Sequence, residues 1–299
     1  MNSLRVRRTI VSTALVLGVL GGGGCMAWRP GWQEPPPTPE VAADPAVLAS
    51  RLAQADERFA ASASQEDVLA AIAEFRAIVA ADPGHYEALS RLGEAYLLLG
   101  AAYASSDSAK ARAYREGIQW CERALATNPE FARLAAAGGM DAAVTSITAR
   151  EFEAAFFWIT GVSYYFKECL RGPAILVHLD WMTHTGRLLR HLESMDPDWG
   201  SGRLQFSLAI FYLGMPARYG GDMDKSARCL ERAIALDPTS LLMRWGRAKY
   251  FHAKLRQPDA ARDDLAWVLA QDPDEAGSPR RWNLYFQRDA RAMVARLDR

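Results

Sequence analysis

The side chains that could do metal chemistry in this chain are few. Three histidines, His178, His184 and His191, fall in one stretch with helical periodicity. His184 and His191 are seven residues apart and share a helix face, but two turns separate them by roughly 10.5 Å, which is too far to share one metal ion without further ligands. The chain contains neither H-E-x-x-H nor C-x-x-C. The sequence therefore predicts no metal site.

The cysteines give no catalytic signal either. Cys25 belongs to an N-terminal signal described below, which leaves Cys121, Cys169 and Cys229. Cys121 and Cys229 occupy or adjoin apolar positions of a helical pattern, where a buried thiol is the expected state. A catalytic nucleophile needs a base and an orienting group, and the sequence contains no P-loop, no G-x-S-x-G and no G-x-G-x-x-G. We expect neither an enzyme nor a cofactor.

Aromatic side chains form the most unusual composition. Residues 152–166, FEAAFFWITGVSYYF, hold seven rings that surround a helix instead of forming one stripe. The apolar run of about a dozen residues is shorter than a bilayer-spanning helix requires. Two interpretations stay open: a helix buried in the core, and a helix whose rings partly line a cavity for an apolar ligand. The candidates for such a cavity are Phe156, Phe157, Trp158 and Tyr165, followed by Trp181, Phe211 and Tyr212.

Helices must position these rings, because one helical pattern recurs along the chain. Each copy ends at an Asp-Pro or Asn-Pro pair, at Pro83, Pro129, Pro197, Pro238 and Pro273. Twelve residues earlier stand Ala71, Gly117, Thr185, Ser226 and Ala261, eight earlier stand Phe75, Cys121, Leu189, Leu230 and Leu265, and five earlier stand Ile78, Ala124, Leu192, Ala233 and Val268. These positions share one face of a helix, which the proline then ends. The pattern predicts the second helix of a hairpin, with a small residue where the first helix approaches.

The first helix of such a hairpin is clearest after Pro83. Leu89, Leu92, Gly93 and Tyr96 resemble the opening of a tetratricopeptide repeat. The prolines are 46, 68, 41 and 35 residues apart, whereas a regular array repeats every 34. We therefore predict an all-α fold of degenerate tetratricopeptide-like hairpins with inserted helices. The expected helices span residues 46–61, 65–81, 86–104, 110–127, 152–166, 173–196, 201–213, 223–236, 240–254, 258–271 and 281–297.

The residues before this body have a different composition. Residues 1–24 have a basic start and an apolar run, and with Cys25 they resemble a bacterial lipoprotein signal, although Gly22 stands where that signal usually has Leu. An uncleaved anchor or a plainly secreted chain is the alternative. Residues 25–45 would then be a lipidated Cys25 followed by an extended proline-rich tether of roughly 60 Å. In it, Trp28 and Trp32 are expected at the membrane interface. The helical-repeat domain spans residues 46–299.

The charge of the chain excludes one class of partner. It has 35 basic and 35 acidic residues and no basic stripe with interleaved aromatics. Nucleic-acid binding is therefore not expected.

A turn and the helix after it resemble one known family. The pattern P-x₃-G-G-D-x₂-K-x₄-L-E-x-A comprises Pro216, Gly220, Gly221, Asp222, Lys225, Leu230, Glu231 and Ala233. It looks like the T component of the tripartite ATP-independent periplasmic (TRAP) transporters, as do the Trp158-bearing helix and the lipoprotein start. The resemblance covers roughly residues 46–299. We interpret Gly220, Gly221 and Asp222 as structural, the glycines forming a tight turn and the aspartate capping the next helix.

The resemblance implies a function as well as a fold. It implies a periplasmic lipoprotein, anchored to a membrane through Cys25, that assembles as a homotrimer and pairs with the solute-binding P component. Its implied task is to help handle an apolar ligand between the membrane and that protein. Another class stays open: a tetratricopeptide lipoprotein that scaffolds an envelope or outer-membrane complex and holds no ligand. An aromatic cavity favours the first hypothesis, and an exposed polar groove favours the second.

Overall fold

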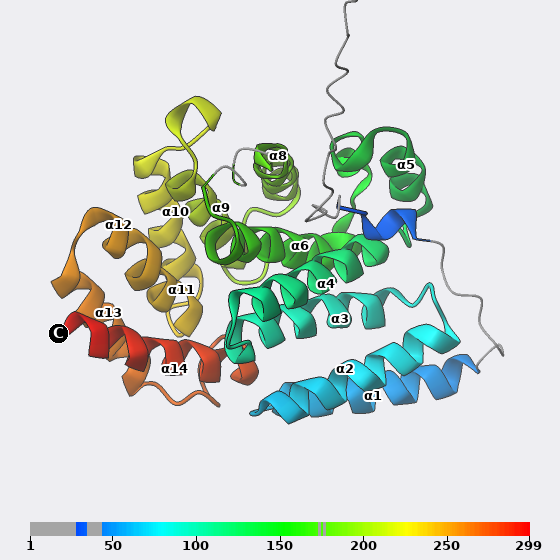
Figure 1. The fold of residues 1–299 in the computed structure, drawn as a ribbon, viewed down its shortest axis with the longest axis horizontal. Coiled ribbons are helices and arrows are strands. Elements are labelled where there is room, and N and C mark those ends of the chain that lie inside the picture. Colours follow the sequence, from blue (N-terminus) through cyan, green and yellow to red (C-terminus); the bar gives the residue numbers. More distant parts are fainter. Residues whose placement is uncertain (1–27, 35–43, 173–174, 176–177) are drawn as a thin grey trace, which may run out of the picture.

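The protein is built from helices that pair along the chain (Figure 1). The computed structural model describes residues 28–34, 44–172, 175 and 178–299. These residues contain no β-strand, which confirms the all-α class. Nor does any helix among them have the length and apolar character needed to cross a membrane. The predicted signal over residues 1–24 and the lipidation site Cys25 lie outside the described part of the chain.

The main helices are α1 (Pro45–Ala61), α2 (Gln65–Ala81), α3 (Tyr86–Leu98), α4 (Asp107–Leu125), α5 (Pro129–Ala143), α6 (Phe152–Tyr164), α8 (Leu179–Met195), α9 (Arg203–Gly214), α10 (Met223–Leu236), α11 (Leu241–Gly246), α12 (Ala253–Leu255), α13 (Pro258–Ala270) and α14 (Arg280–Leu297). Three of the first helices in the hairpins end in π-helical turns: η2 (Leu99–Tyr103), η5 (Tyr165–Cys169) and η7 (Arg247–His252). Short 3₁₀ turns are η1 (Gly31–Gln33), η3 (Val144–Ser146), η4 (Ala149–Glu151) and η6 (Ala217–Tyr219).

The predicted repeat face is the buried face of five helices. The small and apolar residues twelve, eight and five positions before each proline lie on α2, α4, α8, α10 and α13, and all of them are buried. Four of these helices end just before the Asp-Pro pair, as predicted. Pro129 differs, because it stands in the first turn of α5 behind the capping Asn128 and begins an inserted helix. The helical pairs are therefore observed, while their tetratricopeptide-like character stays a prediction.

The crossing of α3 and α4 shows why the small residues matter. A Cβ on Gly93 would lie 2.3 Å from the Cys121 Sγ, and one on Gly117 would lie 2.8 Å from a Leu97 methyl. No side chain larger than hydrogen fits at either point without movement of its neighbours. The two glycines therefore let the backbones of α3 and α4 come together.

The chain curls so that its last helix returns to the first ones. In Figure 1, α6 lies in the middle, with α1 to α4 on one side and α9 to α14 on the other. The Arg280 guanidinium at the start of α14 donates to the Ala61 carbonyl at the end of α1, at 3.2 Å. Residues Arg281 and Trp282 bond to Glu94 of α3. Helix α14 thus joins the two halves around the central helix instead of ending an open stack.

The N-terminal segment 28–34 corrects one expectation. It is not an extended tether, because η1 lies against α4 and the Gly31 N–H donates to Glu122 Oε2 at 2.6 Å. Trp28 meets Trp181 edge-on with ring centroids 4.5 Å apart, and Trp32 meets Phe131 at 6.0 Å. By packing on the body, the two tryptophans expose less apolar area to water than they would in a free tether. The free tether is therefore not observed for residues 28–34, while the placement of the two tryptophans at a membrane interface stays a prediction.

Candidate functional site

One face of α6 forms the floor of a cavity. Phe156, Thr160, Ser163 and Lys167 follow one another at intervals of four, three and four residues and all line it. That spacing keeps side chains on one helix face, and eleven residues at 1.5 Å each extend over roughly 16 Å. The opposite face of α6 contacts α4, where a Cβ on Gly161 would lie 2.7 Å from Ile118. The aromatic helix is therefore core on one side and cavity wall on the other.

The other walls come from α9, α11, η7 and α14. The space between its lining atoms is about 810 Å³, a figure that includes solvent at the open side of the cavity. Eight aromatic rings line it: Phe156, Phe157, Tyr164, Phe206, Trp245, Tyr250, Trp282 and Phe286. The rings contact each other closely, with centroids of Trp245 and Phe286 4.6 Å apart and those of Phe156 and Phe157 5.2 Å apart. An aromatic, concave surface of this size suits an apolar ligand.

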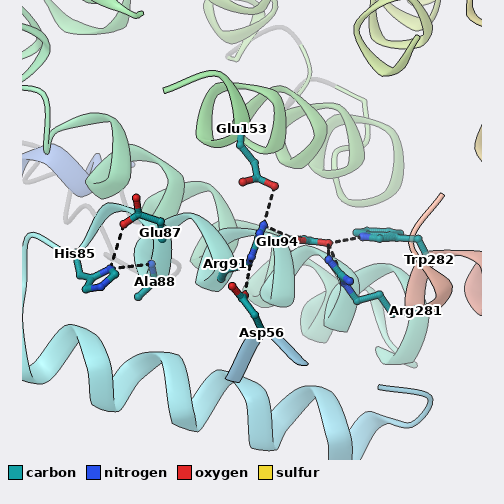
Figure 2. Close-up of polar contacts among 9 residues, drawn as sticks. All are labelled: Asp56, His85, Glu87, Ala88, Arg91, Glu94, Glu153, Arg281 and Trp282. Carbon is teal, nitrogen blue, oxygen red and sulfur yellow. Dashed lines mark hydrogen bonds and ion pairs between the residues drawn. The ribbon is translucent and has the colours of Figure 1, made fainter. Parts of the chain in front are cut away.

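A buried carboxylate, Glu94, fixes one wall of the cavity (Figure 2). Its Oε1 accepts hydrogen bonds from Arg281 at 3.0 and 2.5 Å and from the Trp282 indole at 2.9 Å. Arg91 lies 3.6 Å from Oε2 and also pairs with Asp56 and Glu153. Burial alone would raise the pKa of Glu94, but Arg281 and Arg91 outweigh it and hold that pKa below its ordinary value. The ionised carboxylate therefore ties α14 to α3.

Two cations line the cavity without a carboxylate partner. Among the described residues, no acidic oxygen lies within 4.0 Å of the Lys167 ammonium or the Arg203 guanidinium. Lys167 Nζ lies 3.6 Å from the Tyr250 ring centroid, and the Arg203 guanidinium lies 5.0 Å from the Trp199 ring. Surrounding protein atoms, followed by Lys249 and Lys254, lower the pKa of Lys167 to about 7. Much of the Lys167 side chain is nevertheless exposed. Protein atoms lie around it, but its free side faces the cavity, which is partly open to solvent.

The seven predicted rings do not share one place. Phe156 and Phe157 line the cavity. Trp158 faces away from it, and its indole donates to Glu122 Oε1 at 3.1 Å. Tyr165 and Trp181 belong to a second cluster with Trp28.

The remaining two rings lie on α9, outside the cavity. Phe211 contacts Tyr212 at 5.8 Å and lies over Gly186, where a Cβ would be 2.6 Å from its ring. Phe206 and Ile210 of α9 line the cavity instead. The ring-rich stretch of the sequence thus lies on α6, which lines the cavity in part, while the sequence pattern does not predict the partner faces of the other walls.

The predicted turn lies apart from the cavity and has a structural geometry. Gly220 has φ +95°, a left-handed conformation that favours glycine. A Cβ on Gly221 would fall 1.8 Å from the Met215 carbonyl oxygen. Asp222 accepts from the Lys225 N–H at 2.9 Å and caps α10. None of the three lines the cavity.

The histidines and cysteines have structural surroundings. His184 Nδ1 lies 2.6 Å from Asp141, His191 bonds to the Ile147 carbonyl at 3.0 Å, and His178 contacts the Trp181 ring. In the described ranges, no three His, Cys, Asp or Glu side chains converge in a way that could hold a metal ion. Cys121 is fully buried, while Cys169 and Cys229 are partly exposed, and all three are free thiols.

Comparison with known proteins gives one family. A family model described as "TAtT: TRAP transporter T-component" matches residues 64–299, which is most of the chain and includes every residue that lines the cavity. No curated protein matches the chain.

Proposed function

The chain belongs to the TRAP transporter T-component family, and from this premise we propose that it is a periplasmic lipoprotein that receives an apolar ligand in its aromatic cavity. In this proposal a lipid on Cys25 holds it to a membrane, and it hands the ligand to the solute-binding P component. It acts as an accessory component of a transporter and not as an enzyme. The protein works as a homotrimer, as the family resemblance implies.

The observation that carries this proposal is the ring-lined cavity itself. Eight aromatic side chains face one concave space, partly open to solvent, between α6, α9, α11 and α14. Its lining is mostly apolar, which suits an apolar ligand, whereas a scaffold for other proteins would be expected to present an exposed polar groove. The cavity therefore favours ligand handling over the alternative, a tetratricopeptide scaffold for envelope assembly without a ligand.

A lipid-retention experiment tests the ligand. The purified full chain is incubated with a lipid extract of its own organism, repurified and analysed by native mass spectrometry. We expect an apolar molecule to be retained by the wild type. Ser207→Phe, which fills the cavity from α9, should abolish retention. Ser108→Phe, at an exposed position near the start of α4, is the matched control and should retain the ligand. Retention by neither wild type nor control would refute ligand handling.

Affinity capture tests the partner. A full chain with a C-terminal tag is incubated with periplasmic extract, and retained proteins are identified by mass spectrometry. A periplasmic solute-binding protein as the dominant partner is the expected result. Envelope-assembly proteins or an outer-membrane barrel in its place would favour the scaffold. Sedimentation of the purified protein checks the trimer.

A further inference from the structure

We propose that the cavity selects amphipathic anions, with Lys167 binding the acidic head group and the aromatic walls enclosing the apolar chain. The inference rests on the proposed function of the cavity as a ligand site, and it specifies the class of ligand. The chemistry is that of a carboxylate joined to an unbranched hydrocarbon.

Lys167 is one of the two cations of the cavity without a negative partner among the described residues. Lys249 pairs with Asp289 at 3.0 Å, and Lys110 pairs with Glu168 at 2.8 Å. Glu168, the acidic residue next to Lys167, is thus already engaged, and it also accepts from the Tyr114 hydroxyl. The Lys167 ammonium faces the cavity without a counter-ion, and an incoming carboxylate would supply both the charge and the hydrogen-bond acceptors.

The arrangement around Lys167 leaves its donors free. Within the described residues its contact is the face of Tyr250, at 3.6 Å, and a ring face takes up charge but no full hydrogen bond. Arg203, the other unpaired cation of the cavity, is differently placed. Its Nε donates to the Gly200 carbonyl at 3.2 Å, and its guanidinium lies over the Trp199 ring. Lys167 therefore offers the more open site for an anion.

The apolar part of the ligand has a defined path. From Lys167 the face of α6 leads through Ser163 and Thr160 to Phe156, over roughly 16 Å at 1.5 Å per residue. Phe206, Ile210, Leu242 and Trp245 face this path from α9 and α11. A hydrocarbon chain extending from the ammonium would thus lose its contact with water along most of its length.

The charges facing Lys167 set its response to pH. Lys249 and Lys254, from η7 and α12, disfavour its charged form, and Glu168 of its own turn favours it. The ring of Tyr250 lies over its ammonium, and Asp289 of α14 is paired with Lys249. Since the free ammonium has a pKa of about 7, an anionic ligand should bind best at or below neutral pH.

The test compares two probes that differ in the head group, dodecanoate and dodecanol, titrated into the full chain and followed by calorimetry. At pH 6.5 we expect the wild type to bind dodecanoate roughly tenfold to a hundredfold more tightly than dodecanol, because the carboxylate adds a charge-assisted hydrogen bond to Lys167. Lys167→Met should remove this preference while dodecanol affinity stays the same. Lys225→Met, which removes an exposed lysine of α10 outside the cavity, is the control and should keep it. From pH 6.5 to pH 9 the wild type should lose affinity for dodecanoate but not for dodecanol.

The outcomes separate this inference from the proposed function. Equal affinity of the wild type for both probes, or a preference that survives in Lys167→Met, overturns the role of Lys167. Binding of neither probe overturns the ligand site itself. Should Lys167→Met fail to fold, Lys167→Gln decides, because a preference for dodecanoate that survives in it contradicts a role for the ammonium.

Discussion

Replacing Glu94 by glutamine tests whether the buried charge network holds the cavity wall. Glutamine keeps the shape and one acceptor but removes the negative charge that faces Arg281 and Arg91. The side chains of Glu94 and Arg281 are only 2% and 11% exposed, so water cannot replace the lost partner. Removing one member of a buried pair costs roughly 3 to 5 kcal/mol. We expect a loss of that size in the free energy of unfolding.

Urea denaturation at pH 7 measures this loss, and Glu153→Gln is the matched control. Glu153 pairs with the same Arg91 at 2.7 Å, but its side chain is 35% exposed, and such pairs are worth about 1 kcal/mol or less. Because the pKa of Glu94 is lowered on folding, its contribution is present above its ordinary pKa and lost as the pH falls through the folded value. The gap between wild type and Glu94→Gln should therefore close in acid. Equal losses for the two variants at pH 7 would refute the reasoning.

Three further predictions concern the α3–α4 crossing, the N-terminal segment and the cavity. Gly93→Ala should lower the free energy of unfolding by roughly 1 to 2 kcal/mol, because overpacking against Cys121 exceeds the gain in helix propensity. Gly214→Ala is the control, since its Cβ would meet no other atom, and it should not destabilise the protein. The midpoints of urea denaturation measure both effects. Burial raises the pKa of Glu122 to about 8. The contribution of its protonated form to stability, full below about pH 4.5, should therefore be lost as the pH rises through 8. Glu122→Gln should abolish this pH dependence of the free energy of unfolding. Trp245→Ala should lower dodecanol affinity at least tenfold in calorimetry, because it removes a buried ring from the cavity wall.

Much of the fold follows from periodicity and proline placement. Residues 65–81 and 223–236 are helices with the predicted bounds, because Ser64 and Asp222 cap their starts and Asp-Pro pairs follow their ends. Helix α4 begins three residues before the predicted start, since Ser106 caps it there. The stretch 240–254 is one predicted helix but is divided into α11, η7 and α12, and a π turn leaves no signal in a pattern of apolar residues.

The cavity was less accessible to prediction than the helices. Its rings Trp245, Trp282 and Phe286 lie 81 or more residues after the end of α6, and those of α14 stand at the cavity because α14 returns to α3. That return depends on Glu94, a charged residue that by composition alone would be expected at the surface. Lys167 keeps the spacing of the α6 face that lines the cavity, but a lysine would by composition be expected at the surface, so this position gives no signal of a site.

The bound segment 28–34 changes how the body would sit on a bilayer. Its contacts with α4, Phe131 of α5 and Trp181 of α8 fix where the chain leaves the helical body. With the proposed lipid on Cys25, two residues separate the anchor from Trp28, and the three peptide steps reach at most about 10 Å. The body would then ride against the headgroups in a restricted orientation, with the α4–α5–α8 side turned to the lipid. In place of a long flexible tether, the anchor would be a short segment that restricts the body. The proposed P component would then have to bind the side of the body that faces away from the membrane.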